Sequence, residues 1–197
     1  LSSPDALIVA RAPIPPPEDA ENMSGFELER DVPTHHTRIK VVGIGGAGAN
    51  AVEYMLRAEI PNVEFLVVNS DARILERSNC ANRIQIGDEL THGLGAGGDP
   101  ELGYQAAEAS ADALAAALDH TDMLFLSAGM GGGTGTGATP VLARLAREKD
   151  ILTVAIVSKP FRFEGRQRTR KAEAGLARLR EFVDTLIVIS NDRLLEA

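Results

Sequence analysis

Short apolar runs alternate with longer stretches of helical periodicity from Arg38 to the end of the sequence. The apolar runs, which we expect to be strands, lie at residues 38–43, 63–68, 83–86, 122–127, 151–157 and 185–189. The expected helices lie at residues 48–58, 101–119, 136–148 and 165–182, with a short one near 72–77 and another beginning at about 191. Continuously apolar strands that alternate with helices are typical of a parallel sheet buried on both sides. The sequence therefore predicts an α/β fold: a Rossmann-like three-layer domain with a mainly parallel sheet and helices on both faces.

The segment before this pattern has a different composition. Residues 1–37 are rich in Pro and acidic residues and show no sustained periodicity. Segments that can bury so little apolar surface stay disordered. We therefore expect a disordered Pro-rich and acidic N-terminal tail at residues 1–37 and one folded domain at residues 38–197.

The overall composition excludes several classes of protein. The formal net charge is −8, aromatic residues make up 4% of the 197 residues, and Trp is absent. Because nucleic-acid binders usually carry a basic surface and stack bases on aromatic rings, we expect no nucleic-acid partner.

The single cysteine, Cys80, cannot form an internal disulfide. No run reaches the ~18 apolar residues of a membrane span, and residues 1–10 lack the basic start of a signal peptide. We expect a cytoplasmic protein that does not insert into a membrane.

The first glycine-rich segment, "GIGGAGAN" at residues 43–50, follows the first expected strand. Gly43, Gly45 and Gly48 satisfy the pattern G-x-G-x-x-G, and Asp71 follows about twenty residues later. Taken alone, this pattern favours a dinucleotide such as NAD. The pattern is weak evidence, however, because any strand-to-helix turn at a phosphate site favours the same glycines. The P-loop pattern G-x-x-x-x-G-K-[ST] is absent from the sequence.

Two further glycine-rich segments follow later strands. They are "GLGAGGDPE" at residues 93–101 and "GGGTGTG" at residues 131–137, and Thr134 and Thr136 add hydroxyl groups to the second of these. In a parallel sheet all three segments lie at the carboxyl ends of the strands, where ligands bind. A dinucleotide needs one such turn, whereas three turns of exposed backbone N–H groups suit the oxygens of a di- or triphosphate.

A fourth loop, "SKPFRFEGRQRTR", follows the strand at residues 151–157. Glu164 and Arg168 are four residues apart at the start of the next helix. They could form a surface ion pair worth a few tenths of a kcal/mol. Their place at the binding edge favours a second interpretation, in which the carboxylate accepts from sugar hydroxyls beside a guanidinium near the phosphates.

Five motifs in order resemble those of the tubulin/FtsZ family of GTPases. They are "GGAGAN", "GLGAGGDPE", "AGMGGGTGTGA", "PFRFEGRQR" and "VDTLIVISNDRLLE", and they extend from about Arg38 to Ala197. The resemblance implies a GTP-binding domain of a filament-forming cell-division protein. It implies GTP or GDP as the ligand, with Mg²⁺ bound beside the nucleotide. It also implies head-to-tail self-association of the full-length protein, membrane tethers of the division machinery as partners, and a cytoplasmic location at the division site.

The resemblance also assigns residues to the nucleotide. Gly46 to Asn50 would line the phosphates and nucleoside, with Asn50 touching the base, and Asn191 would hydrogen-bond guanine. Asn69 and Asp71 would lie near the phosphates and the magnesium ion, with Asp71 as the metal residue. The full set of predicted nucleotide-binding residues is Gly45, Gly46, Ala47, Gly48, Ala49, Asn50, Asn69, Asp71, Ala96, Gly97, Gly98, Gly131, Gly132, Gly133, Thr134, Gly135, Thr136, Gly137, Glu164, Arg168 and Asn191.

No catalytic residue is expected in this chain. In the family, the motif "NDRLLE" opens a central helix, and the loop after that helix carries the catalytic carboxylates. The resemblance therefore implies that GTP is hydrolysed only between subunits of the full-length protein and that residues 1–197 alone are inactive.

Two other functions stay open from the residues alone. An NAD-dependent oxidoreductase could be built on Gly43 to Gly48, but it would need a substrate domain with a catalytic His or Lys. A family relative that binds nucleotide without hydrolysing it, as a regulatory or scaffold module, would share every motif above.

Overall fold

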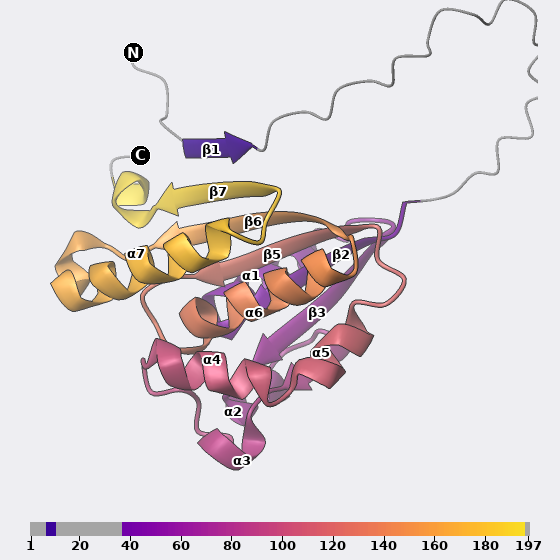
Figure 1. The fold of residues 1–197 in the computed structure, drawn as a ribbon, viewed down its shortest axis with the longest axis horizontal. Helices are drawn as coiled ribbons and strands as arrows, with labels where there is room; N and C mark the ends of the chain where they lie inside the picture. The colour runs from indigo at the N-terminus through magenta and orange to yellow at the C-terminus, as the bar shows by residue number, and fades with distance from the viewer. Residues whose placement is uncertain (1–6, 11–36, 196–197) are drawn as a thin grey trace, which may run out of the picture.

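The computed structural model describes residues 7–10 and 37–195. Its centre is one sheet with the strand order β1-β7-β6-β5-β2-β3-β4 (Figure 1). All neighbouring strands are parallel except β1, which runs antiparallel to β7. The strands are β1 (Leu7–Ala10), β2 (Ile39–Ile44), β3 (Val63–Asn69), β4 (Asn82–Gln85), β5 (Met123–Gly129), β6 (Leu152–Lys159) and β7 (Thr185–Ser190). The predicted α/β fold with a mainly parallel sheet is confirmed.

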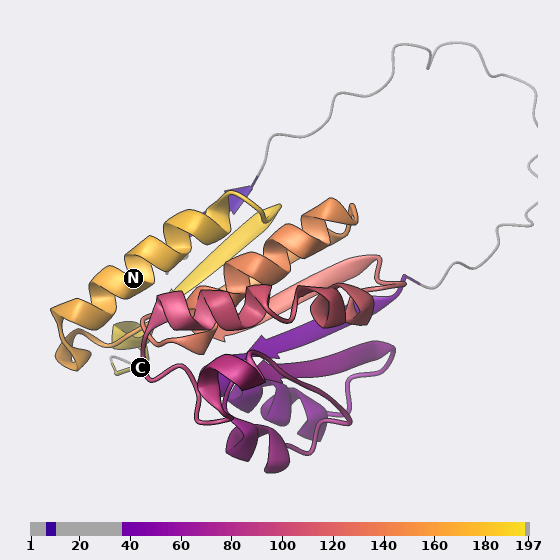
Figure 2. The ribbon, with the colours of Figure 1, turned by 60° about the horizontal axis from the view of Figure 1, so that its bottom comes forward.

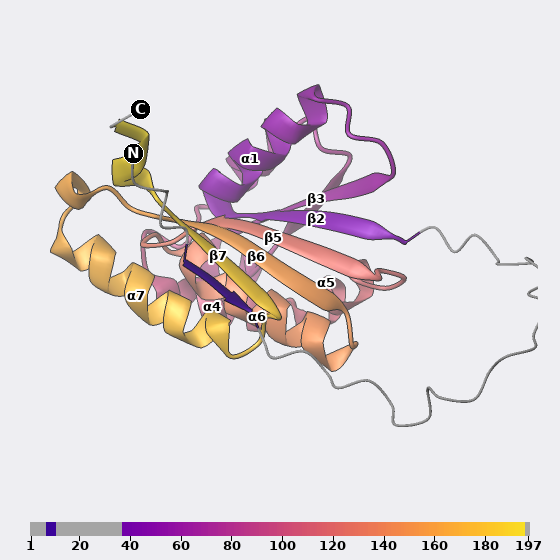
Figure 3. The ribbon, with the colours of Figure 1, turned by 90° about the horizontal axis from the view of Figure 1, so that it is seen from above.

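Helices cover both faces of the sheet. They are α1 (Gly45–Arg57), α2 (Ala72–Glu76), α3 (Asp88–Thr91), α4 (Pro100–Glu108), α5 (Ala111–Ala117), α6 (Thr134–Glu148) and α7 (Arg166–Arg180), with 3-10 turns η1 (Arg162–Glu164) and η2 (Asn191–Leu195). Figure 3 shows α1 on one face of the sheet and α4, α6 and α7 on the other, and Figure 2 shows these three side by side. No helix of the described part of the chain is long and apolar enough to cross a membrane.

Each face of the sheet has its own hydrophobic core. The smaller core lies under α1 and α2 and includes Val52, Val67 and Cys80. The larger core joins the other face to α4 through α7 and includes Leu126 and Leu142, both fully buried. Two buried faces explain why the central strands read as continuous apolar runs rather than as an alternating pattern.

Several helices differ from the expectation. Helix α3 was not expected, and the helix expected to begin at about 191 is the 3-10 turn η2. The stretch 101–119 is divided into α4 and α5, because the Ser110 hydroxyl accepts the N–H of Gly87 at 3.1 Å and the Ser110 carbonyl begins the next helix. Helices α1 and α6 begin at Gly45 and Thr134, a few residues earlier than expected. Gly45, Gly46 and Gly48 in α1 and Gly135 and Gly137 in α6 are therefore first-turn helical residues, held there by packing that outweighs their low helix propensity.

The N-terminal segment differs from the expectation at four residues. Within the tail expected to be disordered, Leu7–Ala10 pairs with β7 in the register Leu7↔Val188 to Ala10↔Thr185 (Figure 1). The sequence "LIVA" is apolar and rich in β-branched residues, so it suits an edge strand beside the open side of β7. The remainder of the expected tail up to residue 36 lies outside the described residues.

Candidate functional site

A pocket of about 420 Å³ lies at the carboxyl ends of the parallel strands. In Figure 3 this is the left-hand edge of the sheet, where α1 and α7 begin. Most of the predicted site residues line it, although their role as ligand contacts remains a prediction. Those lining the pocket are Gly46, Ala47, Asn69, Asp71, Ala96, Gly97, Gly132, Gly133, Thr134, Gly135, Glu164, Arg168 and Asn191. The fold thus brings residues from six separate segments to one place.

The N-termini of α1 and α6 meet at this pocket. A Cβ on Gly45 would lie 2.9 Å from the amide nitrogen of Gly135, so only glycine allows the two first turns to approach this closely. Gly45 also has φ +70°, a conformation that glycine adopts without strain. The N–H groups of a first helical turn have no partner within the helix, and the helix dipole adds partial positive charge there. Two such ends beside one pocket form a site for an anion.

Hydroxyl groups fix the glycine-rich segment before α6. The buried hydroxyls of Ser70 and Thr134 are 2.7 Å apart, which ties the end of β3 to the start of α6. The Thr136 hydroxyl accepts the N–H of Gly131 at 2.8 Å, and Thr136 is buried. The two threonines, which look equivalent in sequence, therefore differ: Thr134 lines the pocket, whereas Thr136 holds the turn closed from inside.

The other predicted residues do not line this pocket. These are Gly45, Gly48, Ala49, Asn50, Gly98, Gly131, Thr136 and Gly137. A Cβ on Gly48 would overlap the carbonyl oxygen of Ser127, and one on Gly137 would overlap that of Pro100. Ala49 is buried in the core under α1, and Asn50 is exposed on α1. Several of the motif glycines therefore have a packing role in this structure.

Asn69, the last residue of β3, carries a buried amide that is only partly satisfied. Its Oδ1 accepts the N–H of Asp71 at 3.1 Å. Its Nδ2 and the hydroxyl of Thr121 are the buried side-chain atoms of the described residues that have no hydrogen-bond partner. Because an unpaired buried donor is costly, and because Asn69 lines the pocket, this NH₂ group is a donor available to a ligand.

Asp71 and Arg73 form an ion pair at the edge of the pocket. The Asp71 carboxylate caps α2 by accepting the N–H of Arg73 at 3.0 Å, and it accepts from the guanidinium at 3.1 and 2.9 Å. The hydrogen bond from the Arg73 side chain is the main cause that lowers the pKa of Asp71 below its usual range. Asp71 is therefore an anion that lines the pocket and is already paired with a cation.

Glu164 and Arg168 form the ion pair that their spacing allows, and both line the pocket. Glu164 also accepts the N–H of Phe161 at 2.9 Å, so the carboxylate closes the 3-10 turn η1. The same loop is tied to the segment after β7, because the N–H of Arg162 donates to Asp192 at 3.0 Å. These bonds place Asn191, which comes directly before Asp192, beside the loop.

Eight further lining residues are not in the set of predicted nucleotide-binding residues given above, although Gly95 belongs to one of the predicted phosphate turns. They are Ile44, Ile74, Leu94, Gly95, Gly129, Met130, Ser158 and Pro160. Leu94 and Gly95 lie within the glycine-rich segment at residues 93–101, and most of the others lie at or next to the end of a strand. The expected strand ends could therefore have indicated them. The apolar members give the pocket a wall that could pack against a flat ring or a sugar.

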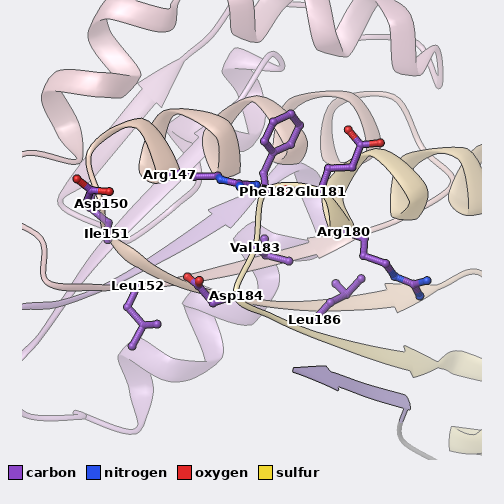
Figure 4. A pocket seen from close by; sticks show the side chains of 10 residues that line it. All are labelled: Arg147, Asp150, Ile151, Leu152, Arg180, Glu181, Phe182, Val183, Asp184 and Leu186. Atoms are coloured by element: carbon purple, nitrogen blue, oxygen red, sulfur yellow. Dashed lines mark hydrogen bonds between the residues drawn. The ribbon is translucent and has the colours of Figure 1, made fainter. Parts of the chain in front are cut away.

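A second hollow, of about 620 Å³, lies at the opposite edge of the sheet, where β6 and β7 begin (Figure 4). Two of the charged side chains that line it bond to the backbone: Arg147 donates to the carbonyl of Glu181, and the Asp184 carboxylate accepts the N–H of Thr153 at 2.8 Å. Ligands of parallel α/β sheets bind at the carboxyl ends of the strands. The smaller pocket is therefore the candidate site.

A parallel sheet with helix N-termini and glycine-rich turns around one pocket defines the class of α/β nucleotide-binding domains. A family model described as "Tubulin/FtsZ family, GTPase domain" matches residues 38–197. The chain belongs to the tubulin/FtsZ family.

Named relatives agree with this assignment. "Cell division protein FtsZ" of Buchnera aphidicola is 54% identical over 158 residues, which cover 80% of this chain and 41% of that protein. The protein of the same name from Coxiella burnetii is 53% identical over 170 residues, which cover 86% and 44%. The chain thus spans less than half the length of these relatives.

Solved structures show the same fold. An empty FtsZ dimer of M. jannaschii superposes with a TM-score of 0.80 at 44% identity, covering 82% of this chain and 47% of that one. A protofilament of CetZ2 from Haloferax volcanii with GTPγS bound gives a TM-score of 0.73 at 26% identity, covering 79% and 50%.

Proposed function

We propose that residues 38–197 form a GTP-binding domain and that the pocket at the carboxyl ends of the strands holds GTP or GDP. The observation that carries the proposal is the meeting of the α1 and α6 N-termini beside the glycine turn at residues 95–98. The phosphates occupy this nest of N–H groups, with Gly46 and Ala47 on one side and Gly132 to Gly135 on the other.

The remaining pocket residues suit the nucleoside. In this proposal the Glu164 carboxylate accepts from ribose hydroxyls and the Arg168 guanidinium lies near the phosphates, which is supported by the position of both residues in the pocket lining. Asn191 hydrogen-bonds guanine, because an amide offers both a donor and an acceptor. Asn50 lies one helical turn after Gly46 on α1, with its exposed amide on the same side, and contacts the base.

Mg²⁺ accompanies the nucleotide in this proposal, and Asp71 is the residue that holds it. Among the described residues, no group of three or more His, Cys, Asp or Glu side chains forms a metal cage. This fits Mg²⁺, which in nucleotide sites is held by phosphate oxygens and water with one or two carboxylates. When bound, the ion neutralises phosphate charge, while Arg73 keeps the Asp71 carboxylate oriented.

The full-length protein is proposed to be a cytoplasmic cell-division GTPase that associates head to tail, with hydrolysis at the interface between subunits. Membrane tethers recruit it to the division site. In the described part of the pocket the carboxylates are Asp71 and Glu164, and each is paired with an arginine. Asp71 also holds Mg²⁺ in this proposal, so both carboxylates already have a role, and we assign no catalytic residue in this chain. Residues 1–197 alone should therefore bind nucleotide without hydrolysing it.

Calorimetric titration with GDP, ADP and NAD tests the ligand. We expect GDP to bind at least ~10-fold more tightly than ADP or NAD, a difference of about 1.4 kcal/mol. Tighter binding of ADP would overturn the guanine assignment, and tighter binding of NAD would favour a dinucleotide enzyme. GDP should also bind much more tightly than guanosine, because the helix N-termini contribute to the affinity only when the ligand carries phosphates.

A further inference from the structure

The glycine-rich turn after α3 is poorly packed at its tip. Gly97 and Gly98 have φ values of +55° and +77°, and the N–H of Asp99 closes the turn on the carbonyl of Ala96 at 2.8 Å. Positive φ at both central residues is the pattern of a type I′ turn. A Cβ on either glycine would meet no atom of the described residues within 4 Å. Side-chain packing therefore does little to hold the tip in place.

The two ends of the turn are better held than its tip. The N–H of Gly95 donates to the carbonyl of Ser70 at 3.2 Å. Ala96 is buried, and it lies so near Gly133 that a Cβ on Gly133 would come within 2.8 Å of the Ala96 methyl group. The turn therefore begins against the pocket wall, and Gly97 lines the pocket. These contacts leave the far side of the tip unsupported.

A lysine on α7 contacts that side of the tip. Lys171 Nζ donates to the carbonyl oxygen of Gly98 at 2.7 Å, although the two residues are 73 positions apart in the chain. Lys171 is half-buried, so its stem packs on the protein while its amine reaches the turn. A hydrogen bond from a charged donor is stronger than one between neutral groups. Among the described residues, Lys171 is the one whose side chain forms a hydrogen bond with the tip of the turn.

The same side of α7 contacts the other parts of the site. Arg168, three residues before Lys171, lines the pocket, and a Cβ on Gly131 would lie 2.9 Å from its carbonyl oxygen. Arg178, seven residues after Lys171, lies 3.8 Å from the Glu101 carboxylate and over the ring of Tyr104 on α4. Residues spaced by three and seven share one helix face. Helix α7 therefore spans the site from the glycine segment before α6 to the start of α4.

We propose that Lys171 is a positioning residue that holds the Gly97–Gly98 turn in its binding conformation over the phosphate part of the pocket. The inference rests on the proposed function for the identity of the ligand, but not for the contact itself. By holding the Gly98 carbonyl toward α7, Lys171 limits the rotation of the peptide unit between Gly98 and Asp99, which directly follows two glycines. The loop amides are then ordered before a phosphate arrives, which lowers the entropy cost of binding.

Three variants of residues 1–197 test this. Lys171→Met keeps the apolar stem and removes the donor, Lys171→Arg restores a cationic donor, and Arg170→Met removes a neighbouring exposed charge from the same helix as the matched control. In the nucleotide-free protein, we expect the amides at residues 96–99 to exchange with deuterium at least ~5-fold faster in Lys171→Met than in the wild type. Lys171→Arg and Arg170→Met should exchange like the wild type.

The binding readout separates positioning from general damage. Lys171→Met should bind GDP roughly 10-fold more weakly and guanosine as well as the wild type, because guanosine has no phosphates for the turn to meet. Lys171→Gln, whose shorter amide does not reach the turn, repeats the measurement if Lys171→Met lowers the unfolding midpoint.

Unchanged exchange and unchanged GDP affinity in both variants would overturn the proposal. An equal loss for guanosine and GDP would show a structural role instead. Failure of the wild type to bind GDP would remove the proposed function, whereas the exchange data would still decide whether Lys171 orders the turn.

Discussion

The hydroxyl oxygens of Ser70 and Thr134 lie 2.7 Å apart, and both side chains are buried. Ser70 follows β3, and Thr134 is the first residue of α6, so this hydrogen bond joins two neighbouring parts of the candidate site. The Ser70 carbonyl also accepts the N–H of Gly95 at 3.2 Å. A single serine thus connects the glycine turn at 95–98 with the helix N-terminus that is proposed to receive the phosphates.

The costs of removing the Ser70 and Thr134 hydroxyls should not be additive. Thr134→Val leaves the Ser70 hydroxyl buried and unpaired, so we expect a loss of about 1–3 kcal/mol in unfolding free energy. The double variant Ser70→Ala with Thr134→Val removes both polar groups and should be less destabilised than the sum of the single variants. Urea unfolding of the four proteins measures the coupling. Strict additivity would show that the two hydroxyls do not depend on each other.

Gly132 offers a cleaner test of the phosphate nest than Gly135 does. A Cβ on Gly132 meets no described atom within 4 Å, whereas one on Gly135 would lie 2.6 Å from the carbonyl oxygen of Gly129. Gly132→Val should therefore fold normally, within about 0.5 kcal/mol of the wild type, and reduce GDP affinity at least ~10-fold by filling the pocket. Gly135→Val should itself destabilise the fold by about 3 kcal/mol through overpacking. Calorimetry and urea unfolding measure both effects, and wild-type GDP affinity in a folded Gly132→Val protein would refute the nest.

The glycines of this segment show which features can be predicted from the sequence and which cannot. The alternation of apolar runs and helical stretches predicted the parallel sheet, because period and burial are local properties of the chain. The glycine pattern also predicted which strand ends carry the site. It could not tell Gly132, which faces the pocket, from Gly137, which faces Pro100. The unpaired amide of Asn69 could not be predicted either, because burial and hydrogen-bond partners depend on packing between distant segments.

The edge of β7 provides a test of the N-terminal strand. Leu7–Ala10 pairs with Thr185 to Val188 in antiparallel register. In an edge strand, alternate residues direct their N–H groups toward the neighbour, so only one of Ile8→Pro and Val9→Pro should remove a ladder hydrogen bond. That variant should raise deuterium exchange of the β7 amides at least ~10-fold, and the other proline variant serves as its control. Equal exchange in both variants and the wild type would show that β7 does not depend on this strand.

Glu53 should give the domain a pH-dependent stability. Its carboxylate on α1 accepts from Ser78 Oγ at 2.6 Å, from the Asn79 N–H at 2.7 Å and from Asn79 Nδ2 at 2.9 Å. The hydrogen bonds from Ser78 and Asn79 lower the pKa of Glu53 below its ordinary value of 4.5. Because the pKa of Glu53 is lower in the folded state than in the unfolded state, the ionised carboxylate stabilises the fold at pH values above the unfolded-state pKa. This contribution is lost as the pH falls through the folded-state pKa.

The matched variant for Glu53 is Glu53→Gln, which keeps the shape and removes the charge. At pH 7 it should be less stable than the wild type by about 1–2 kcal/mol, because hydrogen bonds to a charged group are lost. The difference should shrink as the pH is lowered from about 5 toward 3. Urea midpoints measured at several pH values check the trend. A difference that stays constant over this range would show that the charge of Glu53 is not responsible.

Residues 1–197 alone should bind GTP without turning it over. Hydrolysis needs a group that orients water in line with the γ-phosphate, in addition to a cradle that holds the phosphates. The pocket carboxylates in the described part of the chain are Asp71, which pairs with Arg73 and caps α2, and Glu164, which pairs with Arg168 and closes η1.

Phosphate release, followed at rising protein concentration with GTP and Mg²⁺, should therefore stay at the level of the buffer, while calorimetry under the same conditions reports binding. Arg73→Ala and Arg168→Ala, which release each carboxylate in turn, identify the source of any activity that is seen. Turnover by the wild type that is proportional to protein concentration would mean that this chain completes its own catalytic site. Loss of that turnover on changing Asp71 or Glu164 to its amide would then name the carboxylate responsible.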